Sequence, residues 1–167
     1  KLALQDAARR CVAVRLISKS PATNDLPEIS LVGRGHYKDL LAVNESPEVA
    51  ACHSADKGLR IWEWVGQSAT EAERRQGTMH SKYAVIDGRR SLVGSYNLDP
   101  RSEKLNSESA VVFLQRELSA QLRRRFLEDH LGFGSEVTPE QAAQFESPES
   151  VVERFRKSIG HLFENEL

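Results

Sequence analysis

The chain has 167 residues, of which 40% are hydrophobic and 28% are charged. These values are typical of about one folded domain and exclude a disordered or collagen-like chain. The 23 basic and 24 acidic residues leave a formal net charge of -1. This balance excludes a general electrostatic attraction to nucleic acid or anionic membrane, so any anion site must be local. No run approaches the ~18 apolar residues of a membrane span, and we expect any membrane contact to be peripheral.

Two cysteines, Cys11 and Cys52, are too few for a disulfide framework in a chain of this length. Cys11 begins an apolar segment, and a buried free thiol is the expected state there. Cys52 is followed by His53, but no second pair stands at metal-ligand spacing. We therefore expect no metal and no cofactor.

The first half of the chain predicts helices and strands in alternation. Residues 2–10 have apolar residues at helical spacing, and the β-branched run 11–17 predicts a strand. Residues 18–31 carry the residues of a loop, 35–43 predict a helix, and 59–65 alternate as a strand with one buried face. A helix and strand at the very start are the middle of an α/β unit, which suggests a fragment of a longer protein.

The central part of the chain predicts a hairpin and a buried strand. Residues 66–77 are polar and predict a loop or a short exposed helix. The apolar runs 83–86 and 91–93 flank Asp87-Gly88, a strong hairpin signal. The continuous apolar run 109–114 predicts a strand that is covered on both faces.

The last part of the chain is predicted to be helical. A helical pattern follows residue 114 and breaks at 132–135. Two closing helices are expected at 139–145 and 148–163, capped by Thr138 and Ser147, each with proline in the first turn.

The candidate catalytic residues lie around the predicted hairpin. His80 and Lys82 are two apart, so on a strand they project to the same side. The returning strand can bring Ser95 and Asn97 beside them. An ammonium, a hydroxyl and a carboxamide suit a phosphate, and an imidazole can attack its phosphorus.

A nucleophilic histidine needs its second ring nitrogen held by a carboxylate or carbonyl. Glu108, which opens the next predicted strand, is the candidate for this role with His80. Because no metal cluster accompanies these residues, the nucleophile is expected to be protein or substrate.

This combination resembles the phospholipase D superfamily, whose signature is H-x-K-x4-D-x6-G-[ST]-x-N. The segment 97–108, NLDPRSEKLNSE, resembles the bacterial cardiolipin synthase branch. The resemblance implies a mixed α/β sheet with helices on both faces, with residues 1–167 as a single domain and one half of a pseudo-twofold, two-motif architecture. The residues that match the signature are His80, Lys82, Asp87, Gly94, Ser95 and Asn97.

The resemblance also implies a phosphohistidine mechanism. His80 would attack the phosphodiester, and water or a second alcohol would then release the phosphoryl group. Lys82 and Asn97 would bind the phosphate oxygens, Ser95 would support them, and Glu108 would orient the imidazole. The motif residues with a structural role would be Asp87 and Gly94.

Family members combine two such motifs, one histidine acting as nucleophile and the other as general acid. In this chain the pair His36 and Lys38 also has the H-x-K spacing, but Val43 and Ala50 stand where the signature requires Asp and Gly, so only the motif that begins at His80 is complete. The second motif is therefore expected from a missing N-terminal half, the favoured alternative, or from a homodimer mate.

The residues favour phospholipid over nucleic acid as substrate. The arginines 123–125 could follow a nucleic-acid backbone, but the net charge of -1 does not support a large footprint. Alternatives are a homodimeric nuclease-type phosphodiesterase and a non-catalytic half-domain that binds phospholipid or nucleic acid. We expect a cytoplasmic protein, or one peripheral on the inner face of a bacterial membrane. The apolar side chains offered for lipid contact are Phe126, Leu127, Leu131, Phe133, Phe155, Ile159, Leu162 and Phe163.

Overall fold

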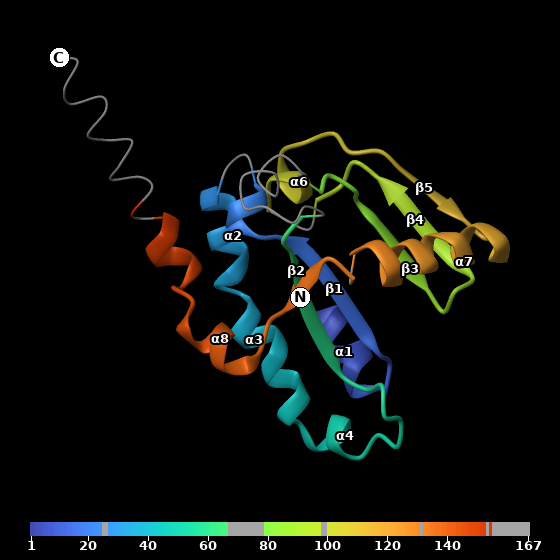
Figure 1. Cartoon of the computed structure of the whole chain (residues 1–167), viewed down its shortest axis with the longest axis horizontal. Helices are drawn as coiled ribbons and strands as arrows, with labels where there is room; N and C mark the ends of the chain where they lie inside the picture. Colours follow the sequence, from blue (N-terminus) through green and yellow to red (C-terminus); the bar gives the residue numbers. More distant parts are fainter. Residues whose placement is uncertain (25–26, 67–78, 98–99, 131, 153, 155–167) are drawn as a thin grey trace. The chain divides into compact units, whose positions relative to one another are not determined.

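The computed structural model describes residues 1–24, 27–66, 79–97, 100–130, 132–152 and 154 (Figure 1). The chain divides into two compact units, the first made of Lys1–Thr78 with Phe133–Leu167 and the second of Met79–Gly132. Each unit has its own three-stranded sheet, which confirms the mixed α/β class. That residues 1–167 act as one domain stays a prediction. No helix in the described part of the chain is long and apolar enough to cross a membrane.

The sheet of the first unit is mixed. Strand β1 (Val14–Lys19) runs parallel to β2 (Leu59–Trp64), and β6 (Gly134–Glu136) pairs antiparallel with the other side of β2. The strands predicted at 11–17 and 59–65 are thus confirmed. The expectation that only one face of 59–65 is buried is wrong, because the consecutive residues Ile61, Trp62, Glu63 and Trp64 are all buried. Strand β6 falls where the sequence predicts only a break, because three residues are too few for a recognisable alternation.

The core of the first unit lies against one face of this sheet. Leu59 and Ile61 are buried and two residues apart, so they share a face of β2, and Val14 pairs with Leu59 on the neighbouring strand. Tyr37 and Phe145 meet edge to face, with ring centroids 6.0 Å apart, and join α3 to the end of α8. The helices of this unit are α1 (Leu2–Arg9), α2 (Pro27–Arg34), α3 (Tyr37–Leu41), α4 (Pro47–Ala50) and α8 (Pro139–Gln144), with 3-10 turns at Pro21–Thr23 and Ala42–Glu45.

The predicted helix caps are confirmed. The Gln141 amide donates to the Thr138 hydroxyl at 3.2 Å, and the Thr138 amide donates to the Gln141 side chain at 2.9 Å, which makes a capping box. The Ser150 amide donates to the Ser147 hydroxyl at 3.2 Å, and residues 148–152 are helical. The rest of the predicted 148–163 helix, except 154, lies outside the described residues, as does the predicted loop at 66–77 beyond residue 66.

The expected state of the cysteines is wrong. Cys11 and Cys52 form a disulfide with Cα atoms 5.5 Å apart, and Cys11 is exposed rather than buried. Cys11 follows α1 in a left-handed conformation (φ 66°), and Cys52 follows α4. Since the two cysteines are 41 positions apart in the sequence, their approach depends on how the two helices pack, which no local pattern reveals.

Reduction of this disulfide should destabilise the first unit. In the chain-entropy model, a cross-link spanning 41 residues contributes about 4 kcal/mol to the free energy of unfolding. Both tryptophans, Trp62 and Trp64, are buried in β2, so urea unfolding followed by their fluorescence reports on this unit. We expect a reductant to lower the unfolding midpoint of the wild type.

The matched control is the double variant Cys11→Ala, Cys52→Ala, in which the reductant should have no effect. A wild-type midpoint that is the same with and without reductant would show that the bridge does not stabilise the fold.

The sheet of the second unit is antiparallel, in the order β3 (Tyr83–Ile86), β4 (Arg90–Gly94), β5 (Ala110–Phe113). Helix α7 (Arg116–Arg125) packs on one face, where Ser119 accepts a hydrogen bond from Ser91 at 2.7 Å. A π-helical turn (Phe126–His130) continues α7, and α6 (Pro100–Lys104) lies between β4 and β5 in the sequence.

The prediction that the run 109–114 is covered on both faces is wrong. Val111 and Val112 are 57% and 60% exposed. They point to opposite faces of β5, which is the end strand of its sheet. The apolar run predicted the strand correctly, but it did not predict whether other elements cover the faces of that strand.

The hairpin between β3 and β4 is confirmed. Asp87 and Gly88 both have positive φ, 53° and 61°, as in a type I′ turn. The Arg89 amide closes the turn by donating to the Ile86 carbonyl at 3.1 Å.

Candidate active site

His80 and Lys82 lie just before β3, in the extension of that strand. The Gly94 amide donates to the Lys82 carbonyl at 3.0 Å, so the pairing of β3 with β4 continues past Tyr83. His80 is exposed and Lys82 is half-buried. The Lys82 ammonium donates to the backbone carbonyl of His80 at 2.9 Å, which keeps the cation next to the histidine.

Gly94 is required by the close approach of β5. A Cβ at this position would meet the Ser109 carbonyl oxygen and lie 2.9 Å from the Ala110 Cα. The Ser95 amide donates to the same Ser109 carbonyl at 2.9 Å. Because no side chain separates the strands here, the start of β5 and Glu108 come against Ser95.

Glu108 accepts hydrogen bonds from Ser95 and Asn106. The Ser95 hydroxyl makes a short bond to one carboxylate oxygen, and the Asn106 amide donates to the other at 3.2 Å. These bonds, that of Ser95 first, hold the pKa of Glu108 below its ordinary value of 4.5, with help from Ser102 and the positive charge of Lys82.

The structure thus joins Glu108 to Ser95 rather than to His80. No hydrogen bond between the His80 ring and Glu108 occurs among the residues that the structure describes. Orientation of the imidazole by Glu108 therefore stays a prediction, whereas positioning of the Ser95 hydroxyl by Glu108 is visible.

Replacing Ser95 by alanine should raise the pKa of Glu108 toward 4.5, because the lost hydroxyl stabilises the carboxylate. The lowered pKa means that this network stabilises the fold above about pH 4.5. That contribution is lost as the pH falls through the folded-state pKa. Carboxyl-detected NMR titration of the wild type and of Ser95→Ala measures both midpoints.

The matched control is Ser107→Ala, which removes an exposed hydroxyl beside Glu108 and should leave the midpoint unchanged. An equal midpoint in Ser95→Ala and the wild type would show that Ser95 does not hold the carboxylate.

The remaining motif residues lie at opposite ends of the hairpin. Asn97 is exposed just after β4, and its backbone amide donates to the buried Ser102 hydroxyl at 3.2 Å. Asp87 lies in the turn at the far end of β3 from His80. Its place is in line with the structural role that the resemblance implies.

The antiparallel pairing therefore brings the start of β3 and the end of β4 to the same end of the hairpin. That the four side chains converge on one phosphate stays a prediction. Their chemical groups are an imidazole, an ammonium, a hydroxyl and a carboxamide, and those of His80, Ser95 and Asn97 are exposed. The second unit has nine basic and seven acidic residues, a slight excess that favours an anion. In the described part of the chain, no three histidine, cysteine or acidic residues are grouped to hold a metal ion.

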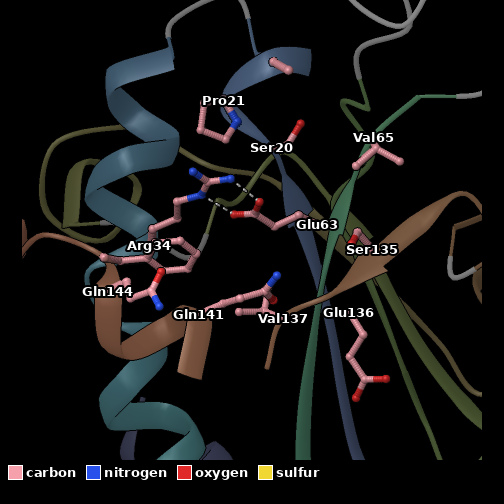
Figure 2. A pocket seen from close by; sticks show the side chains of 12 residues that line it. Ser20, Pro21, Arg34, Glu63, Val65, Ser135, Glu136, Val137, Gln141 and Gln144 are labelled. Carbon is pink, nitrogen blue, oxygen red and sulfur yellow. Dashed lines mark hydrogen bonds and ion pairs between the residues drawn. The ribbon is translucent and has the colours of Figure 1, made fainter. Parts of the chain in front are cut away.

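The first unit holds a separate cavity of about 620 Å³, which no motif residue lines (Figure 2). Arg34 from α2 makes two hydrogen bonds to the buried Glu63 of β2, at 2.7 and 2.5 Å, and its guanidinium lies 4.7 Å from the Phe145 ring centroid. Burial, and then the charge of Glu63, raise the pKa of Tyr37 to about 12.

Sequence reasoning missed this ion pair. The available signal was a glutamate within the alternating β2 strand, at a position that shares the face of Ile61. Because Arg34 neutralises Glu63, the pair is satisfied within the fold.

The family model described as "Cardiolipin synthase, PLD-like domain" matches residues 2–130. The chain belongs to this phospholipase D-like family. The resemblance drawn from the motif is thereby confirmed, and the match covers both the first strands and the whole hairpin.

Curated relatives are much longer than this chain. It is 30% identical to cardiolipin synthase A of Klebsiella pneumoniae over 139 residues, 83% of this chain and 20% of the relative. It is 29% identical to the probable cardiolipin synthase YwiE of Bacillus subtilis over 129 residues, 77% of this chain and 21% of the relative. The chain thus spans about a fifth of the length of these relatives.

Among solved structures, the chain is similar to the phospholipase D family member Nuc from Salmonella typhimurium. The TM-score is 0.49 at 18% identity, over 81% of this chain and 71% of that one.

Proposed function

We propose that this chain is a phosphodiester-cleaving or phosphatidyl-transferring enzyme unit that acts on phospholipid through a phosphohistidine intermediate. The observation that carries the proposal is the complete motif on one hairpin. Pairing of β3 with β4 brings His80 and Lys82 to the same end as Ser95 and Asn97.

In the first step, a ring nitrogen of His80 attacks phosphorus and forms a P–N bond while the bond to the departing alcohol oxygen breaks. Lys82 and Asn97 offset the negative charge on the phosphoryl oxygens, and Ser95 supports them. In the second step, water or another alcohol attacks phosphorus and loses its proton. The P–N bond breaks and His80 is restored.

The first step also needs a general acid, because an alkoxide departs poorly without a proton. His80 cannot be nucleophile and acid in the same step. The proposal therefore includes a second histidine motif, from another part of a longer protein or from a second copy of this chain.

The placement of the basic residues and the exposed apolar side chains favour a phospholipid as the substrate, so that His80 would receive a phosphatidyl group. The arginines 123–125 are exposed in the last turn of α7, where cations complement the helix dipole. Leu127 and Phe133 are 40% and 41% exposed, which agrees with peripheral lipid contact. Leu131, Phe155, Ile159, Leu162 and Phe163, which were also expected to offer apolar surface, lie outside the described residues. The relatives bear the name cardiolipin synthase, which adds support.

Two diesters with the same leaving group test the choice of substrate. Phosphatidyl-p-nitrophenol in mixed micelles would leave a phosphatidyl group on His80, and thymidine 5′-p-nitrophenyl phosphate would leave a nucleotidyl group. We expect faster p-nitrophenolate release from the lipid, with none from either compound in His80→Ala. Faster release from the nucleotide would favour the nuclease alternative, and tight micelle binding without release would favour a binding half-domain.

A further inference from the structure

The Cys11–Cys52 pair lies outside the motif, in the first unit. Both cysteines follow a helix whose end is fixed by backbone hydrogen bonds. The Cys11 amide donates to Ala8 at 2.9 Å, and the Cys52 amide donates to Val49 at 3.1 Å. The Lys57 ammonium also donates to the Cys52 carbonyl at 2.9 Å. The two Cα atoms lie 5.5 Å apart, within the usual separation for a disulfide.

The two sides of the bridge differ in exposure. Cys11 is exposed, whereas Cys52 is 5% exposed. A soluble reductant therefore has access to the bridge at Cys11. In a compartment that keeps thiols reduced, such an exposed bridge would not persist.

A shared metal does not explain the pair. His53 follows Cys52, but no third histidine, cysteine or acidic residue joins a ligand set among the residues that the structure describes. A disulfide is the state that the observed separation supports.

We propose that the chain matures in an oxidising compartment, with Cys11–Cys52 as a structural disulfide, and that its active site works there. The bridge forms by exchange with the disulfide of a thiol oxidoreductase. The two cysteines lose two protons and two electrons, the S–S bond between them forms, and the S–S bond of the oxidoreductase is reduced to two thiols. For a bacterial protein, this places the chain outside the cytoplasm, in contrast to the cytoplasmic placement expected from the sequence. The inference does not depend on the proposed substrate.

The test uses the natural protein that contains this chain, in its own cells. Cells are separated into cytoplasmic and extracytoplasmic fractions, each fraction is quenched in acid at once, and its protein is alkylated with a maleimide-polyethylene glycol before or after reduction. Peptides carrying Cys11 and Cys52 are then quantified in each fraction. We expect no reagent on either peptide before reduction, one on each after it, and the protein in the extracytoplasmic fraction.

The variant Cys52→Ser serves as control, because it leaves Cys11 without a partner and should take up reagent at Cys11 before reduction. Reagent on both wild-type peptides before reduction would overturn the disulfide. A fully oxidised protein in the cytoplasmic fraction would contradict the proposed placement outside the cytoplasm. The wild-type measurement decides both points even if the variant does not fold.

Discussion

His80→Ala is expected to lower phosphodiester cleavage by at least about 10⁴-fold, because removing a covalent nucleophile eliminates the intermediate on which both steps depend. The measurement is release of p-nitrophenolate from an aryl phosphodiester under single-turnover conditions. Since His80 is exposed in the described structure, the fold should tolerate alanine there.

His53→Ala is the matched control, because His53 is also exposed but belongs to the first unit. It should retain the wild-type rate. Comparable rates for His80→Ala and the wild type would remove His80 from the reaction.

The 167-residue chain alone is expected to distinguish sharply between leaving groups. A p-nitrophenolate departs without a proton, whereas an alkoxide needs a general acid that a single histidine motif does not supply. General acid catalysis contributes typically 10²–10⁴-fold, so alkyl diesters should react slower than aryl diesters by at least this factor beyond their intrinsic difference. The measurement compares both rates with the same chain and with its His80→Ala variant.

Protein concentration separates the two sources of a second motif. If two copies of the chain complete the site, cleavage of the alkyl diester rises with the square of the concentration below the dimerisation constant. If the second motif lies elsewhere in a longer protein, the alkyl diester stays uncleaved at every concentration. Efficient, His80-dependent cleavage of alkyl diesters by a monomer would refute the requirement for two motifs.

Local sequence signals predicted the central hairpin and the helix caps correctly. The pair Asp87-Gly88 predicted the turn correctly because a type I′ turn needs positive φ at both central residues, which this pair adopts. Thr138 gave a helix start because its hydroxyl accepts from an amide within the first turn. In each case the decisive contact lies within a few residues of the signal.

Features that depend on distant packing could not be predicted in this way. The disulfide links residues 41 apart. The open faces of β5 depend on what covers the sheet rather than on the apolar run itself. The hydrogen bond between Ser95 and Glu108 depends on the absence of a side chain at Gly94, which lets β5 approach β4 closely. Helix α2 begins at Pro27 within a segment that has the composition of a loop, because proline is favoured in the first turn of a helix.

The most direct test of a nucleophilic His80 is to trap the intermediate on the chain. Without a second histidine motif to activate water, the covalent adduct formed from phosphatidyl-p-nitrophenol should accumulate. After a quench at alkaline pH, where phosphohistidine survives, peptide mass spectrometry locates the added group. The predicted result is one phosphatidyl group per chain on His80, formed at the rate of p-nitrophenolate release and absent from His80→Ala. An adduct on another residue, or catalytic release of p-nitrophenolate that persists in His80→Ala, would contradict the mechanism.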